Sequence, residues 1–246
     1  MKKTPTIAEL KELCLKKGVY VGLDKYLSAI AVYITKILLY TPLKPMQVMF
    51  LWFLLQLAAC YIIVQGTYAH VLIGIVLFHF AIILDHVDGQ MARYKKEQSI
   101  LALYVDQIYH NIANPLFIMV LSIAADVFWI GVTIVLFYML NRIIIFNPFI
   151  YNLQDEKAEK TIEEVVKKDQ GKLAYSRLKA HEKTFISHVY EWFRIEHPLS
   201  VIFWGALFGL LEWTLMLYLA LFIVDFFRRL RSQIKSLLSV DRVLYK

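Results

Sequence analysis

Long apolar segments alternate with polar connections along most of the chain. Six segments stand out, at about residues 46–65, 70–92, 99–124, 127–150, 197–209 and 211–229. A helix needs about 20 mainly apolar residues to cross a bilayer, and most of these segments are that long, although the fifth is short. One helix from His197 to Phe227 would exceed the bilayer thickness, and Gly205, Gly209 and Glu212 offer a place to turn. The pattern therefore predicts an all-α polytopic membrane protein with six transmembrane helices.

The connections between these segments differ in charge. Those near 65–70, 124–127 and 209–212 contain neither lysine nor arginine, whereas every other connection and both ends of the chain contain several. Connections rich in lysine and arginine stay on the cytoplasmic side of a membrane. We therefore expect both termini, the turn at 93–96 and the segment 152–196 to face the cytoplasm.

The expected organisation has three parts. Residues 1–45 form a cytoplasmic N-terminal arm that lacks the apolar core of a cleaved signal peptide and ends in an amphipathic juxtamembrane helix at about 26–41. Pro42 and Pro45 break that helix. Residues 46–230 form the six-helix transmembrane domain and include a cytoplasmic helical segment at 152–196. Residues 231–246 form a basic cytoplasmic tail.

Composition excludes two other classes of protein. With 59% hydrophobic residues and a mean hydropathy of +0.54, the chain is too apolar for an ordinary soluble domain. Lysine and arginine (27) outnumber aspartate and glutamate (20), but the basic residues flank apolar segments, so we expect no nucleic-acid partner. The two cysteines, Cys14 and Cys60, have the spacing of neither a disulfide framework nor a metal site, and they are expected to be packing residues.

Acidic residues near the cytoplasmic end of the second apolar segment form the first candidate site. Asp85 and Asp88 share a helix face, and a carboxylate near hydrocarbon is costly unless it is paired, hydrated or bound to metal. Asp106 and His110 form a stripe on the next segment, which would face them if the two segments make a hairpin around 93–99. Such clusters suit Mg²⁺ or Mn²⁺ together with a diphosphate substrate. The less specific interpretation is an ion-paired hairpin without catalysis.

The same residues fall within a longer motif. The spacing D-x2-D-G-x2-A-R-x8-G-x3-D-x3-D marks the CDP-alcohol phosphotransferases, and six of its positions match here: Asp85, Asp88, Gly89, Ala92, Arg93 and Asp106. The chain resembles this family over about residues 26–230. It departs from the motif twice, with Ala102 in place of the glycine and His110 in place of the fourth aspartate.

The resemblance implies roles for the matching residues. One or two Mg²⁺ or Mn²⁺ ions would be bound by Asp85, Asp88 and Asp106. The CDP-linked donor would be contacted by Gly89, Ala92 and Arg93. Ala102 replaces one small residue by another and should still allow two helices to approach closely.

His110 and Asp106 would be the catalytic residues. The last position of the motif holds the base that deprotonates the acceptor hydroxyl, and an imidazole can accept a proton near neutral pH. His110 would therefore act as that base or as a further metal ligand. The remaining interpretation is a hydrogen-bonded group beside the site.

The expected function is transfer of a phospho-alcohol group, such as phosphatidyl, from a CDP-linked donor to an acceptor hydroxyl with release of CMP. This reaction belongs to phospholipid or related lipid and glycan biosynthesis. The resemblance also implies a homodimer in the bilayer. A prokaryotic inner membrane is the expected location, and an endoplasmic reticulum is the alternative. Two alternatives remain open: a catalytically silent protein of the same fold that binds CDP-linked ligands or metal, and a polytopic transporter or scaffold.

Several other polar residues need an explanation. Arg142 lies near the cytoplasmic end of the fourth segment, where it could contact an anionic group of a substrate or snorkel to the interface. His79 is expected to pack in the interior, and Lys44 and Gln47 could border the nucleotide site. The variable positions of the motif, His86 and Gln90, have no assigned role.

Overall fold

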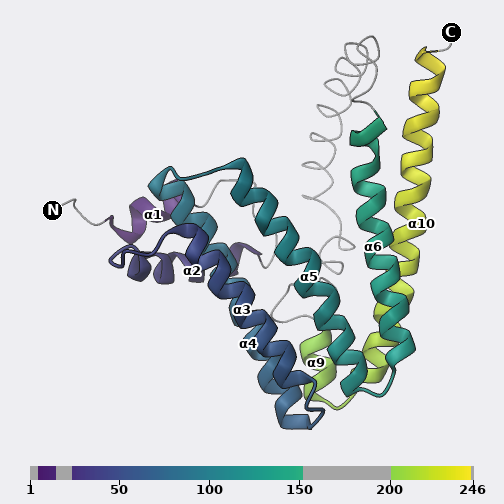
Figure 1. Cartoon of the computed structure of the whole chain (residues 1–246), viewed down its shortest axis with the longest axis horizontal. Coiled ribbons are helices and arrows are strands. Elements are labelled where there is room, and N and C mark those ends of the chain that lie inside the picture. The colour runs from purple at the N-terminus through teal and green to yellow at the C-terminus, as the bar shows by residue number, and fades with distance from the viewer. Residues whose placement is uncertain (1–4, 15–23, 152–200, 245–246) are drawn as a thin grey trace. The chain divides into compact units, whose positions relative to one another are not determined.

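The structure, a computed structural model, describes residues 5–14, 24–151 and 201–244 (Figure 1). Every regular element in these ranges is an α-helix, which confirms the all-α expectation for this part of the chain. The helices are α1 (Ile7–Cys14), α2 (Asp24–Leu38), α3 (Pro45–Ile63), α4 (Tyr68–Lys95), α5 (Ile100–Ala124), α6 (Phe128–Tyr151), α9 (Val201–Leu207) and α10 (Leu211–Leu244). The helical segment expected at 152–196 lies outside the described residues.

Within the described ranges, two helices are long and apolar enough to cross a membrane. They are α3 and α4, which correspond to the first two of the six predicted spans. On α5 the apolar residues before Pro115 are interrupted by five polar or charged ones, Asp106, Gln107, His110, Asn111 and Asn114. The six-span arrangement therefore stays a prediction, although each of the first four apolar segments does form a single helix.

The helix ends follow local sequence signals. α2 ends at Leu38, and α3 begins with Pro45, where the missing N–H of proline costs no helical hydrogen bond. Thr67 and Ser99 cap α4 and α5 through their side-chain hydroxyls. Gly209 has a φ of 70° and turns the chain between α9 and α10, as the sequence predicts.

The described chain forms two compact units. The first holds α1 to α5, α9 and the first turn of α10, and the second holds α6 and the remainder of α10. α10 is continuous from Leu211 to Leu244, so no helix boundary separates the expected basic tail at 231–246 from the apolar segment before it.

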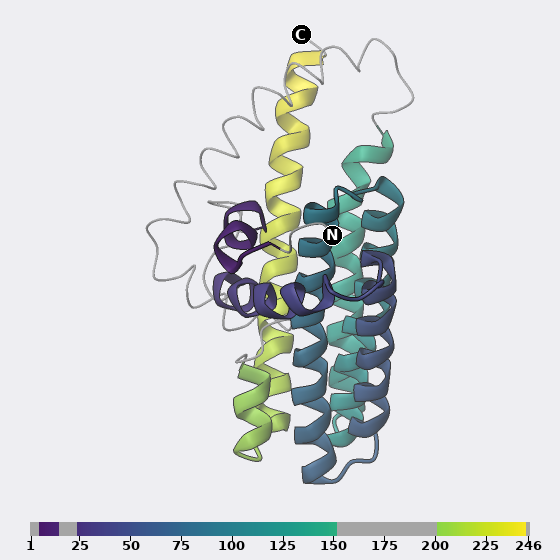
Figure 2. The ribbon, with the colours of Figure 1, turned by 90° about the vertical axis from the view of Figure 1, so that its left-hand side faces the viewer.

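In the first unit, α3 and α4 run antiparallel and side by side, and α5 lies against α3 (Figure 1, Figure 2). Phe78 of α4 stacks on Phe117 of α5 with 3.9 Å between the ring centroids, and both side chains are fully buried. α3 and α4 approach closely at Gly74, where a methyl group would overlap the Ile63 side chain and lie 2.8 Å from the Ala59 carbonyl oxygen.

Gly74→Ala should therefore destabilise the first unit. Overpacking a close helix contact costs about 1–3 kcal/mol, which exceeds the ~1 kcal/mol that alanine gains over glycine in a helix. The matched control is Gly89→Ala, because its methyl group would meet only the Arg93 guanidinium nitrogens, at 3.5 and 3.9 Å. Thermal unfolding in detergent should rank Gly89→Ala above wild type and Gly74→Ala below it, and the reverse order would contradict the close contact.

The helix α2 lies across α4 (Figure 2). Three fully buried polar residues, Ser28 and Thr35 of α2 and Gln90 of α4, join the two helices. Gln90 Oε1 accepts a hydrogen bond from Thr35 Oγ1 at 2.8 Å, and Gln90 Nε2 donates to the Ser28 carbonyl oxygen at 2.8 Å. A buried amide that satisfies both of its polar ends fixes one relative position of two helices, because any slip would leave it unpaired.

The opposite face of α2 is apolar and exposed. Five large side chains follow one another at helical spacing along this face and the turn after it: Tyr26, Ile30, Tyr33, Ile37 and Tyr40. An apolar face with several tyrosines, crossing a helical hairpin, is typical of a helix that lies in a membrane interface.

The second unit pairs α6 with α10 through aromatic contacts. Phe137 and Phe226 lie 5.4 Å apart between ring centroids, and Tyr138 and Phe222 lie 6.2 Å apart. On α10, the buried Asp225 carboxylate accepts hydrogen bonds from Arg228 Nη2 at 2.5 Å and Arg229 Nε at 2.6 Å. These two arginines begin the basic end of α10.

Candidate metal centre

Three side chains from two helices converge at one point. Asp85 lies on α4, and Asp106 and His110 lie one turn apart on α5. His110 Nε2 is 3.6 Å from Asp85 Oδ1 and 3.5 Å from Asp106 Oδ1, and one ligand atom from each residue lies within 4.8 Å of the other two. The side chains of His110, Asp85 and Asp106 are 16%, 23% and 32% exposed, so the group is partly accessible to solutes.

The spacing of these atoms fits a shared divalent ion. Two ligand atoms that are each about 2.1 Å from one ion are ~3.0 Å apart at a right angle and ~3.4 Å apart at a tetrahedral angle. The observed separations of 3.5 and 3.6 Å exceed the right-angle value that octahedral Mg²⁺ or Mn²⁺ prefers, so the side chains would draw together by about half an ångström around such an ion. Both separations are also longer than a good N–H···O hydrogen bond. Two carboxylates and an imidazole are ligands that Mn²⁺ accepts readily, and the carboxylates also suit Mg²⁺.

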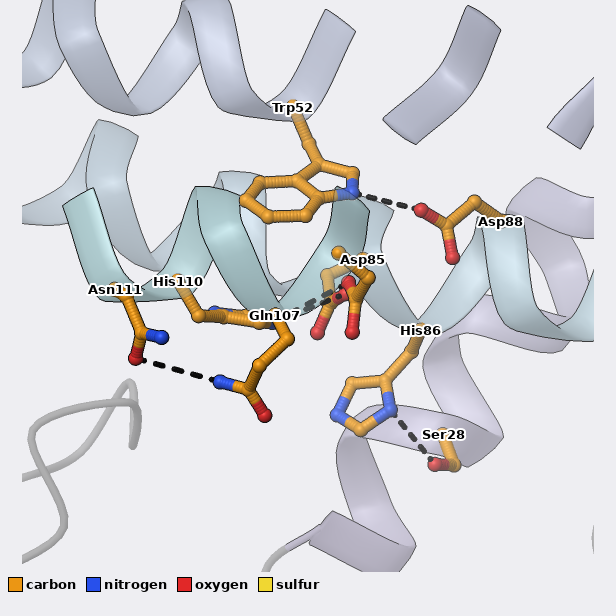
Figure 3. A network of polar contacts seen from close by, with 9 residues as sticks. Ser28, Trp52, Asp85, His86, Asp88, Gln107, His110 and Asn111 are labelled. Atoms are coloured by element: carbon orange, nitrogen blue, oxygen red, sulfur yellow. Dashed lines mark hydrogen bonds and ion pairs between the residues drawn. The ribbon is translucent and has the colours of Figure 1, made fainter. Parts of the chain in front are cut away.

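Asp88, which the sequence places among the metal ligands, has a different partner. Its carboxylate oxygen Oδ2 accepts a hydrogen bond from Trp52 Nε1 at 2.7 Å (Figure 3). The residue is only 5% exposed. The group with metal-ligand spacing consists of Asp85, Asp106 and His110 and does not include Asp88. Of the three aspartates predicted to bind metal, the structure therefore brings two together with His110.

Trp52 also contacts His110. The two rings are stacked, with centroids 5.0 Å apart and an interplanar angle of 29°. Next to them, Tyr109 stacks on Phe53 at 4.1 Å and meets the edge of Trp52 at 5.9 Å. These aromatic contacts hold α5 against α3 at the level of the site, and they fix the plane of the imidazole.

The other motif residues line the last turns of α4. Gly89 faces the Arg93 side chain, since a methyl group at Gly89 would lie 3.5 Å from a guanidinium nitrogen. Ala92 and Arg93 are both half-buried. Ala102 on α5 packs against the cluster that includes Trp52 and Leu84, as expected of a small residue at a helix contact.

Cys14 on α1 lies beside this end of α4. Burial raises the pKa of its thiol, and the positive charge of Arg93 opposes that rise only in part. The thiol is therefore protonated at neutral pH, and it donates a hydrogen bond to the Gln90 carbonyl oxygen 3.6 Å away. Cys14 is a packing residue, as its isolated position in the sequence predicts.

Two residues at variable positions of the motif, His86 and Gln90, connect α4 to α2. His86 Nδ1 lies 3.3 Å from Ser28 Oγ (Figure 3), and Gln90 makes the buried hydrogen bonds described above. Sequence reasoning assigned neither residue a role, because the motif constrains neither position. It also missed Trp52, whose only signal is one indole within an apolar segment.

The remaining candidates lie elsewhere. His79 is buried, and its Nδ1 lies 2.8 Å from the Ile75 carbonyl oxygen, which agrees with an interior packing role. Gln47 accepts a hydrogen bond from the Lys44 backbone N–H at 2.9 Å and so caps α3. In the second unit, Arg142 donates to the Tyr138 hydroxyl at 3.1 Å. Its contact with a substrate stays a prediction.

No protein-family model matches the chain, and no curated protein matches it. The likeness to the CDP-alcohol phosphotransferases therefore rests on the spacing of the motif.

Proposed function

We propose that the chain is a membrane-embedded phosphotransferase that moves a phospho-alcohol group from a CDP-linked donor to an acceptor hydroxyl and releases CMP. The observation that supports this proposal most directly is the convergence of Asp85, Asp106 and His110. These residues lie at both ends of the motif and on two helices. Asp106 and His110 follow Asp85 by 21 and 25 positions in the sequence. They meet it only because the chain reverses between α4 and α5. A chance match in sequence would not require that meeting.

The transfer needs charge neutralisation and a base. Mg²⁺ or Mn²⁺ held by Asp85 and Asp106 would supply positive charge to the diphosphate of the donor. The acceptor oxygen forms a bond to the β-phosphorus, and the bond from that phosphorus to the bridging oxygen breaks, so that this oxygen leaves with CMP. His110 takes the proton of the acceptor hydroxyl. The carboxylates 3.5 and 3.6 Å from Nε2 stabilise the imidazolium that results.

The donor's nucleotide would lie against the last turns of α4. Gly89 carries no side chain there, Ala92 has only a methyl group, and Arg93 offers a cation for phosphate. Arg142 would contact a further anionic group of a substrate.

The membrane setting is supported by exposed apolar surface. α3 and α4 present large apolar side chains that are 43–71% exposed, among them Phe50, Leu54, Tyr61, Ile73, Val76 and Phe80. Such a surface on long apolar helices fits contact with lipid tails. We therefore propose a multi-pass protein of the bilayer, with six spans, a cytoplasmic active site and α2 in the interface. A homodimer and a prokaryotic inner membrane complete the proposal.

The test is metal-dependent release of CMP by the purified full-length protein in nanodiscs. A panel of CDP-linked donors and candidate acceptors is incubated with Mg²⁺ or Mn²⁺, and CMP is quantified by chromatography. We expect release with at least one donor and acceptor pair, and its loss with a chelator. Donor binding without CMP release would identify the silent binding protein instead, and neither binding nor release would favour the transporter or scaffold.

A further inference from the structure

Trp52 links two charged parts of the site that lie on different helices. Its indole N–H donates to Asp88 on α4 at 2.7 Å, and its ring face stacks on His110 of α5. Trp52 itself lies on α3 and is fully buried. One rigid side chain thus sets the positions of both a carboxylate and an imidazole.

The hydrogen bond matters because Asp88 is buried. A carboxylate that is 5% exposed needs a donor or a cation, and the indole N–H is the donor that the structure provides. Asp88, which accepts this hydrogen bond, lies three residues after Asp85 in the motif. Unlike Asp85, it does not belong to the group that also contains Asp106 and His110. The Trp52 N–H takes the place that a cation would otherwise have beside Asp88.

We propose that Trp52 is a positioning residue. It keeps the Asp88 carboxylate away from the metal-binding group of Asp85, Asp106 and His110, and it fixes the orientation of the His110 ring in that group. This inference rests on the proposed metal-dependent function. It departs from the expectation that all three aspartates bind metal directly. Asp88 then contributes negative charge near the ion without being one of its ligands.

The experiment measures Mn²⁺ binding to the full-length protein in nanodiscs, by the loss of the free Mn²⁺ signal in electron paramagnetic resonance. The variants are Asp88→Asn, Trp52→Phe and the double variant, with Asp85→Asn as the example of a lost ligand. Asparagine keeps a hydrogen-bond acceptor for the indole, and phenylalanine keeps an aromatic face for His110. Trp213→Phe, which changes an exposed tryptophan on α10, is the matched control.

We expect Asp88→Asn to bind Mn²⁺ within about threefold of wild type, whereas Asp85→Asn loses binding. Trp52→Phe should bind Mn²⁺ about tenfold more tightly, because the released carboxylate gains a cation in place of its lost donor. The double variant should return to the wild-type affinity, since the gain depends on Asp88. Loss of Mn²⁺ binding in Asp88→Asn, or equal tightening in Trp52→Phe and the double variant, would overturn the proposal.

A second measurement needs no metal. In protein labelled with ¹⁵N-indole, the Trp52 N–H resonance is identified by its disappearance in Trp52→Phe, and it should shift in Asp88→Asn. An unshifted resonance would exclude the hydrogen bond and with it the positioning role. If wild type binds no Mn²⁺ while this resonance shifts, the metal-dependent function fails and the Trp52–Asp88 contact stands. If Trp52→Phe does not fold, Mn²⁺ binding by Asp88→Asn decides: binding within about threefold of wild type supports the proposal, and loss of binding overturns it.

Discussion

Asp106→Asn should lower the rate of CMP release at least about a thousandfold. The substitution keeps the size of the side chain but removes one of the two carboxylates that face His110 Nε2. An ion that neutralises the charge of a diphosphate lowers the activation barrier by several kcal/mol. Each 1.36 kcal/mol of barrier changes the rate about tenfold, so loss of the ion slows the reaction strongly. CMP release at saturating donor and Mn²⁺ is the measurement, with Mn²⁺ binding measured in parallel.

The matched control is Asp126→Asn, at the opposite end of α5. Asp126 is exposed and has a φ of 57°, a backbone conformation that asparagine also tolerates. Its CMP release should equal that of wild type. Full activity in Asp106→Asn would remove the metal centre from the mechanism, whatever the control shows.

His110→Ala should lower CMP release by about 10²- to 10⁴-fold while Mn²⁺ binding stays within a few fold of wild type. That range is the usual contribution of a general base, and Asp85 and Asp106 remain to hold the ion. His110→Asp, which restores the residue that the motif has at this position, should recover much of the lost rate. The readouts are CMP release and the dissociation constant for Mn²⁺.

The two measurements separate the possible roles of His110. Loss of Mn²⁺ binding in His110→Ala would make the imidazole a metal ligand rather than the base. Unchanged CMP release would leave it a structural partner of Trp52. His70→Ala is the control, because His70 is an exposed histidine at the far end of α4, where it contacts Thr67.

Much of the site could be predicted from the spacing of residues along the chain. Asp106 and His110 are four residues apart, and α-helical geometry puts them on one face. The prediction that this face meets α4 also agrees with the structure, since His110 Nε2 lies 3.6 Å from Asp85. The partner of Asp88 could not be predicted in this way, because Trp52 is 36 residues earlier in the chain.

The helices themselves were also predictable, whereas their packing was not. The prolines at 42 and 45 and the glycine at 209 set helix ends by local backbone chemistry, which depends on no other part of the chain. The buried bonds of Gln90 to α2 depend on a crossing of two helices that no periodicity specifies.

The sequence by itself determined the apolar helices, their breaks, and a motif whose residues share helix faces, because each of these follows from neighbours within a few residues. Only the tertiary structure decided which side chains meet. It brought Asp85, Asp106 and His110 close enough together to share one ion. It also placed the indole N–H of Trp52 where it donates a hydrogen bond to the Asp88 carboxylate. A buried carboxylate turns toward whichever donor the packing offers, and that donor comes from a different helix.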